Sequence, residues 1–144
     1  MKTPIVSVNW LKENLQDPEL IILDAVLEPS PHDLQIIGAR TFDIKNKFSD
    51  TSNFLPNTLP KPEAFTAAAR KLGINKNSKI VVYDTKGIYS SPRAWYLFKS
   101  MGHEKVWNKK TEIRTSKVLI SCKTSTTSRA AFCFLTIPGV SRSV

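Results

Sequence analysis

The sequence predicts an α/β fold in which helices cover both faces of a short parallel sheet. Two apolar runs, Leu20–Ala25 and Ile80–Tyr83, have the length and continuous hydrophobicity of strands that are buried on both faces. Two segments with apolar residues at helical spacing, 62–72 and 91–101, alternate with predicted strands along the chain. This alternation is typical of parallel sheets, because each helix supplies the crossover between neighbouring strands.

The first third of the chain contributes a helix and two strands to this prediction. Ser7 is placed to cap a short helix, because its hydroxyl can accept a hydrogen bond from a free amide of the first turn. Residues 28–38 contain two prolines and a glycine and predict a loop, whereas residues 40–44 predict a short strand. Residues 45–60 are polar and rich in turn formers, which predicts a long connection over the fold.

The two longer helices have clear boundaries. Pro62 begins the first and Gly73 ends it, because proline suits the first helical turn and glycine suits the residue after the last. Ser91 and Pro92 begin the second helix, and Gly102 ends it. Both helices therefore lie between segments that predict strands or turns.

The composition is that of one ordinary globular domain. Of the 144 residues, 41% are hydrophobic and 23% are charged, which excludes disorder over the whole length. No apolar run reaches the roughly 18 residues that a membrane helix needs. The first 20 residues lack the continuous apolar stretch of a signal peptide. We therefore expect a soluble, cytoplasmic protein that does not bind membranes.

The net charge of +9 is concentrated at one end of the chain. Residues 1–106 carry 14 Lys and Arg against 11 Asp and Glu, whereas residues 107–144 carry 7 against 1, with 12 Ser and Thr. A basic segment favours phosphate binding, so a nucleic-acid binder is one alternative function. The segment lacks the interleaved basic and aromatic residues that stack bases, so a charged segment with no special partner is the simpler interpretation.

The candidate site is the loop that joins the strongest predicted strand to the second long helix. Loop amides and a helix N-terminus converge there, which favours anion binding at the carboxyl edge of the sheet. Asp84 takes the first loop position, where a nucleophile would stand. In the alternative interpretation, Asp84 only hydrogen-bonds the loop amides and pairs with Arg93. The predicted anion cradle comprises Asp84, Thr85, Lys86, Gly87, Ile88, Tyr89, Ser90, Ser91 and Arg93.

Cys122 is an alternative nucleophile. It follows a predicted strand at 117–121, and Arg129 lies seven positions later, an arrangement similar to that of cysteine phosphatases. The intervening loop has no glycine, and no His or acid next to Cys122 would lower the pKa of its thiol. A small buried or exposed thiol is therefore the simpler interpretation. The two histidines, His32 and His103, lie far apart, so we expect no metal and no cofactor, and a structural hydrogen bond for His103.

The residues up to Trp107 resemble the N-terminal domain of a two-domain rhodanese, the thiosulfate/3-mercaptopyruvate sulfurtransferase family. Ten segments follow one another in the order of that family, and the order is more specific than any one segment. They are Val8-Asn9-Trp10-Leu11, Ile22-Leu23-Asp24-Ala25, Gly38-Ala39-Arg40-Thr41-Phe42-Asp43-Ile44, Phe48-Ser49-Asp50, Leu55-Pro56, Leu59-Pro60, Leu72-Gly73-Ile74, Val81-Val82-Tyr83-Asp84, Ser90 to Trp95 and Gly102-His103.

The resemblance implies a rhodanese fold and a role in moving sulfane sulfur from thiosulfate or 3-mercaptopyruvate to a thiophilic acceptor such as cyanide. In that family a cysteine after the central strand of the second domain carries the sulfur, and Asp84 holds the matching position here. A carboxylate cannot carry a transferable persulfide, because the reaction needs a thiolate. We therefore expect the chain to be inactive alone, with a catalytic rhodanese domain as its missing partner and a small sulfur-containing anion as the ligand of the whole enzyme.

Three further residues bear on the resemblance. Arg40 and Arg93 match the family pattern, and we expect them to be structural or to contact the missing domain. Asn57 stands where the family has a histidine. Whether this chain is itself an enzyme stays open, because the alternative to a sulfurtransferase domain is a non-enzymatic rhodanese-like module that binds a partner or an anion.

The pattern changes after Trp107, where the family continues an internal strand but this chain has Asn108 followed by two lysines. Burial of an unpaired charge costs several kcal/mol, so we expect that the strand cannot continue as it does in the family. We accordingly divide the chain into a rhodanese-like domain, 1–107, and a basic Ser/Thr-rich tail, 108–144. We interpret this tail as the product of a frameshift, a changed exon end or a misread gene model.

Overall fold

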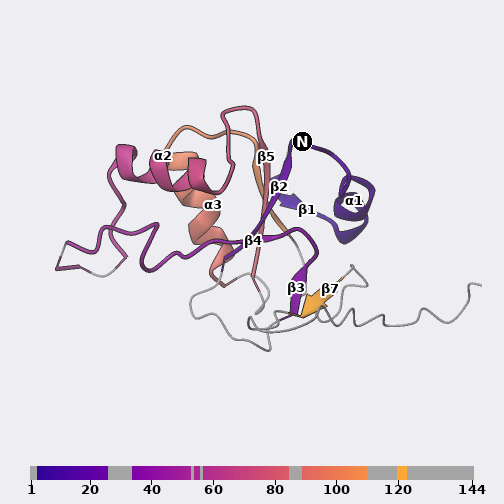
Figure 1. The fold of residues 1–144 in the computed structure, drawn as a ribbon, viewed down its shortest axis with the longest axis horizontal. Helices are drawn as coiled ribbons and strands as arrows, with labels where there is room; N and C mark the ends of the chain where they lie inside the picture. The colour runs from indigo at the N-terminus through magenta and orange to yellow at the C-terminus, as the bar shows by residue number, and fades with distance from the viewer. Residues whose placement is uncertain are drawn as a thin grey trace, which may run out of the picture.

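The computed structural model describes residues 3–25, 34–52, 54–55, 57–84, 89–109 and 120–122. Its central feature is a five-stranded parallel sheet with the order β1-β6-β5-β2-β4 (Figure 1). The predicted parallel α/β fold is therefore confirmed. The strands are β1 (Ile5–Val6), β2 (Leu20–Asp24), β4 (Arg40–Thr41), β5 (Lys79–Tyr83) and β6 (Val106–Lys109).

Helices cover both faces of this sheet, as predicted. Helices α2 (Pro62–Lys71) and α3 (Ser91–Ser100) lie on one side of the strands and α1 (Val8–Glu13) on the other (Figure 1). Side chains alternate between the two faces along β5: Ile80 joins the cluster under α2 and α3, and Val81 joins the cluster under α1. No helix in the described part of the chain is long and apolar enough to cross a membrane.

Four phenylalanines connect the two longer helices to the sheet. Phe42 and Phe48 stack with ring centroids 3.8 Å apart, and Phe65 of α2 meets Phe98 of α3 edge-on at 5.2 Å. Phe98 also lies 5.5 Å from Phe42. All four rings are buried, so α3 and the loop after β4 share one apolar core. This core fixes the position of the first turn of α3, where the candidate site lies.

The predicted helix ends are confirmed. Ser7 is the N-cap of α1, and its hydroxyl accepts a hydrogen bond from the Trp10 amide at 3.2 Å. Gly73 follows α2 with a φ of +69°, and a Cβ there would lie 2.6 Å from Nη1 of Arg40. Arg40 donates a hydrogen bond to the carbonyl of Leu72, which joins β4 to the end of α2.

Loss of the α1 cap should have a modest and measurable effect. We expect Ser7→Ala to lower the free energy of unfolding by about 1 kcal/mol, because the Trp10 amide loses its acceptor. Urea denaturation measures the change, and Asn9→Ala, at an exposed position of the same helix, is the matched control. Equal stability of the two variants would contradict a capping role for Ser7.

Two predictions about short strands are corrected by the structure. Residues Leu34–Ile36, inside the predicted loop 28–38, form β3, which pairs antiparallel with β7 (Ile120–Cys122). The buried Ile36 stabilises this segment, and its amide donates to the Tyr83 hydroxyl at 3.2 Å. The strand predicted at 40–44 is only β4, because after Phe42 the chain turns inward to bury its apolar side chains.

The expectation that the strand cannot continue beyond Trp107 is wrong. Strand β6 includes Asn108 and Lys109 and lies between β1 and β5, with Asn108 opposite Ile5 and Lys109 opposite Val6. The fold therefore contains a buried lysine in this strand, despite the cost that the sequence predicts. The interpretation of residues 108–144 as a non-native tail stays a prediction, and most of that segment lies outside the described residues.

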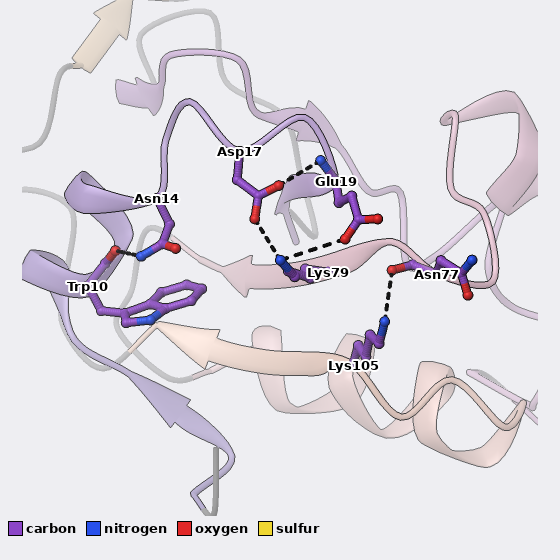
Figure 2. A network of polar contacts seen from close by, with 7 residues as sticks. All are labelled: Trp10, Asn14, Asp17, Glu19, Asn77, Lys79 and Lys105. Carbon is purple, nitrogen blue, oxygen red and sulfur yellow. Dashed lines mark hydrogen bonds and ion pairs between the residues drawn. The ribbon is translucent and has the colours of Figure 1, made fainter.

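A polar network lies at the amino ends of β2 and β5 (Figure 2). Lys79 Nζ lies 2.8 Å from Asp17 Oδ2 and 3.6 Å from Glu19 Oε2, and Lys105 donates to the Asn77 carbonyl at 3.5 Å. The hydrogen bond from Lys79 lowers the pKa of Asp17. Ion pairs this open to solvent contribute little to stability. This edge of the sheet is opposite the candidate site, so the network has no part in it.

Candidate functional site

The candidate site is built around the carboxylate of Asp84. This residue follows β5, the central strand of the sheet, and is only 3% exposed. Its Oδ2 accepts hydrogen bonds from three consecutive backbone amides: Tyr89 at 2.7 Å, Ser90 at 2.8 Å and Ser91 at 2.9 Å. Helix α3 begins at Ser91, so part of this amide cradle is the N-terminus of a helix.

The physical basis of this arrangement is the set of free amides at the start of α3. The first amides of a helix have no acceptor within the helix, and the helix dipole places positive potential there. A carboxylate accepts hydrogen bonds from these amides and places a negative charge at the positive end of the helix dipole. Hydrogen bonds to a charged acceptor are also stronger than hydrogen bonds between neutral groups. The hydroxyl of Ser90 donates to the Ala25 carbonyl, which joins this turn to the end of β2. Asp84 therefore fixes the first turn of α3 against the carboxyl edge of the sheet.

The structure brings together four of the predicted cradle residues, namely Asp84, Tyr89, Ser90 and Ser91. The interpretation that Asp84 hydrogen-bonds the loop amides is confirmed for these three amides. The remaining loop residues of the prediction, Thr85, Lys86, Gly87 and Ile88, lie outside the described residues.

The expected pairing of Arg93 with Asp84 is wrong. Arg93 Nη2 donates instead to the Ser49 hydroxyl at 3.1 Å and to the Asn57 carbonyl at 2.7 Å. Partial burial lowers the pKa of the Arg93 guanidinium. Asn57 has a φ of +60°, a left-handed conformation that asparagine tolerates better than most residues. Arg93 thus holds the loop before α2 against the first turn of α3, which is a structural role.

Sequence reasoning missed a set of polar side chains buried at the carboxyl edge of the sheet. Tyr83 pairs in register with Asp24 of β2, and burial, aided by that nearby carboxylate, raises the pKa of the Tyr83 phenol. Lys109 of β6 is fully buried. The one sequence signal for this residue is a lysine at a position where an internal strand has an apolar residue, and that signal by itself predicts the end of the domain.

The other candidates from the sequence are Cys122 with Arg129 and the two histidines. Cys122 is the last residue of β7, opposite Leu34 of β3, and therefore does not follow a strand of the parallel sheet. Arg129 and His32 lie outside the described residues. His103 Nε2 lies 2.8 Å from the Ser78 carbonyl, which confirms the predicted structural hydrogen bond.

The arrangement at Asp84 binds an anion, and that anion is the protein's own carboxylate. A carboxylate oxygen at this point accepts the amide hydrogen bonds but offers no sulfur nucleophile. The amides of Tyr89, Ser90 and Ser91 are occupied by Asp84. In the described part of the site, these hydrogen bonds fix the turn that leads into α3.

Comparison with known proteins agrees with this architecture. The rhodanese-like domain family matches residues 7–111. The chain is 43% identical over 113 residues to thiosulfate/3-mercaptopyruvate sulfurtransferase 1, mitochondrial, of Arabidopsis thaliana, covering 72% of this chain and 30% of that protein. It is 39% identical over 114 residues to 3-mercaptopyruvate sulfurtransferase of Escherichia coli K12, covering 72% of this chain and 40% of the relative.

A solved structure shows the same fold. The crystal structure of SseA from Escherichia coli, a 3-mercaptopyruvate sulfotransferase, superposes with a TM-score of 0.74 and 32% identity, over 88% of this chain and 53% of that one. The chain therefore spans well under two thirds of the length of these relatives. A family match over residues 7–111 and this superposition lead to one conclusion: the chain belongs to the family of rhodanese-like domains.

Proposed function

We propose that this rhodanese-like domain is the non-catalytic domain of a sulfurtransferase and that the transferred sulfur is carried outside the amide cradle. The single observation that carries the proposal is the Asp84 carboxylate, which accepts the three amides at the position where the family resemblance places the cysteine of catalytic domains. The relatives described above are thiosulfate/3-mercaptopyruvate sulfurtransferases, and they supply the proposed reaction class, which is sulfur transfer from 3-mercaptopyruvate or thiosulfate.

The chemistry of this reaction explains why Asp84 cannot perform it. A thiolate attacks the outer sulfur of thiosulfate, the sulfur–sulfur bond breaks, and sulfite leaves with the electron pair. The resulting persulfide then gives its terminal sulfur to an acceptor such as cyanide, and the thiolate is restored. Both steps need a sulfur nucleophile. Residues 1–121 contain no cysteine, so neither β5 nor the segment that joins it to α3 supplies a sulfur nucleophile.

Intact-mass spectrometry of the full chain after exposure to thiosulfate or 3-mercaptopyruvate tests this proposal. We expect no added sulfur atom and no thiocyanate on addition of cyanide. A persulfide on Cys122 or Cys133 that passes to cyanide would contradict the proposal and make this chain a catalyst by itself.

A gain-of-function variant tests the cradle separately. We expect Asp84→Cys to acquire a thiosulfate-dependent persulfide, because the Tyr89–Ser91 amides would then face the sulfur anion. Tyr96→Cys, at an exposed position of α3, is the matched control and should gain much less. Equal labelling of the two variants would show that the amides do not stabilise such an anion.

A second candidate function is a binding module without a role in sulfur transfer. The loop that Arg93 holds through Asn57 exposes Phe54 (98%) and Leu55 (63%), and exposed apolar groups of this kind favour contact with another protein. Addition of this chain to the sulfur-carrying domain of a relative distinguishes the two candidates. An increase in sulfur transfer supports the first, and unchanged transfer supports the second. The cytoplasmic location and the weaker nucleic-acid alternative stay predictions.

A further inference from the structure

Two buried polar side chains belong to the helix and the strand that meet beside the candidate site. Ser91, the first residue of α3, is 0% exposed, and Asn108 of β6 is 7% exposed. Each carries a buried oxygen, Ser91 Oγ and Asn108 Oδ1, that has no hydrogen-bond partner within the described part of the chain. Buried polar atoms of folded proteins almost always bond to the protein or to an ordered water molecule. These two oxygens therefore point to a site that the mechanism of the cradle does not use.

The backbone hydrogen bonds of the two residues do not require polar side chains. The Ser91 amide donates to Asp84 Oδ2 at 2.9 Å, and the Asn108 amide donates to the Pro4 carbonyl at 2.7 Å. The N-cap of α3 is Ser90, so the helix does not need the Ser91 hydroxyl as its cap. Alanine at position 91 and an apolar residue at position 108 would keep both backbone hydrogen bonds. The two side-chain oxygens are thus available for another partner.

The alternation of side chains along β6 places Asn108 under α3. Val106 belongs to the apolar cluster under α2 and α3. Side chains two residues apart in a strand point to the same face of the sheet, so Asn108 points to the face that Val106 covers. Its neighbour in β5, Val82, pairs with it in register and belongs to the same cluster. Asn108 is therefore a polar side chain in an otherwise apolar layer.

Helix α3 brings Ser91 to the same place. The helix packs against β5 and β6, and Trp95 Nε1 donates to the Val106 carbonyl at 3.0 Å. Because α3 returns from the carboxyl end of β5 to the amino end of β6, its earlier residues lie nearer the carboxyl edge. Ser91 lies four residues before Trp95, which is about 6 Å along the helix. Asn108 lies two residues after Val106, which is about 7 Å along the strand in the same direction. The two steps match, so Ser91 lies over Asn108.

We infer that a water molecule is bound between Ser91 and Asn108, in the layer between α3 and β6. It donates a hydrogen bond to Asn108 Oδ1 and accepts one from the Ser91 hydroxyl. A water molecule suits this pair because it both donates and accepts, whereas an amide oxygen only accepts. The two oxygens supply the two polar partners that an internal water molecule needs at least. The inference does not depend on the proposed function, since it concerns how the first turn of α3 is joined to an internal strand.

Oxygen-17 magnetic relaxation dispersion tests the inference, because it counts the water molecules that stay bound for longer than the protein takes to tumble. The native full chain is compared with the double variant Ser91→Ala/Asn108→Leu, which removes both oxygens and leaves an apolar layer that does not hold water. We expect the dispersion amplitude to fall by the contribution of one ordered water molecule. Ser100→Ala in the same helix is the matched control, because the Ser100 hydroxyl donates to the Leu97 carbonyl at 2.9 Å, and it should leave the amplitude unchanged.

An unchanged amplitude in the double variant would overturn the inference and would mean that the two side chains bond to each other directly. A second measurement needs no variant, so it decides the matter even if the double variant does not fold. In a high-resolution crystal structure of the native full chain, we expect a water peak within about 3 Å of both Ser91 Oγ and Asn108 Oδ1. Electron density without a peak that contacts both oxygens would equally contradict the inference.

Discussion

Replacement of Asp84 with alanine should lower the free energy of unfolding by about 3–5 kcal/mol. Three backbone amides, those of Tyr89, Ser90 and Ser91, would lose their acceptor, and two of these residues are buried. The variant would also remove the charge that compensates the buried Lys109. Both losses affect the same edge of the sheet, where Ser90 and Ser91 are shielded from water. The expected cost is therefore larger than that of an ordinary surface carboxylate.

Urea denaturation at neutral pH measures this cost, and two further variants separate its causes. Asp84→Asn keeps an oxygen that can accept amide hydrogen bonds but loses the charge, so we expect an intermediate loss. Asp50→Ala, which removes a loop carboxylate bonded to Ser52, is the control and should cost much less. If Asp84→Ala and Asp50→Ala lowered the free energy of unfolding equally, the hydrogen bonds of the cradle would not stabilise the fold as we expect.

Replacement of Phe98 with alanine should cost about 4 kcal/mol, because it opens a cavity between α3 and the sheet. Phe98 is 1% exposed and contacts the rings of both Phe42 and Phe65, so its removal affects the centre of the aromatic core. Thermal or urea denaturation measures the loss. Tyr96→Ala on the same helix is the matched control, since its ring is half exposed, and should stay within about 0.5 kcal/mol of the native chain. Similar losses for both variants would contradict the assigned face of α3.

Local sequence signals are sufficient to predict a segment whose structure depends mainly on its own residues. The cap at Ser7, the start of α2 at Pro62 and its end at Gly73 follow from backbone preferences and agree with the structure. The same holds for β5, which ends at Tyr83, because a short continuous apolar run is typical of a strand that is buried on both faces. Asp84, the carboxylate after this strand, is also predicted from the sequence, because the loop and the helix start that follow Asp84 provide free amides.

Local sequence signals do not predict contacts between residues that are far apart in the chain. Strand β3 pairs with β7, which lies more than 80 residues later, whereas the prolines and the glycine that flank β3 predict a loop. Arg93 binds Ser49 and the carbonyl of Asn57 rather than Asp84, a choice that depends on how the loop before α2 packs. The sequence predicts that Lys109 is incompatible with an internal strand, because its nearby counter-charge, Asp84, is 25 residues away in sequence. Burial of an ammonium is costly, but the sequence alone does not show which charge offsets that cost.

The most direct test of the account is amide hydrogen exchange at Tyr89, Ser90 and Ser91 in the native chain and in Asp84→Ala. The account predicts that these three amides are protected in the native chain because each donates to Asp84, and that they exchange rapidly in the variant. The amide of Val82 in β5 serves as the internal reference for global unfolding. Rapid exchange of all three amides in the native chain, with Val82 still protected, would show that the Asp84 carboxylate does not occupy the cradle and would contradict the account.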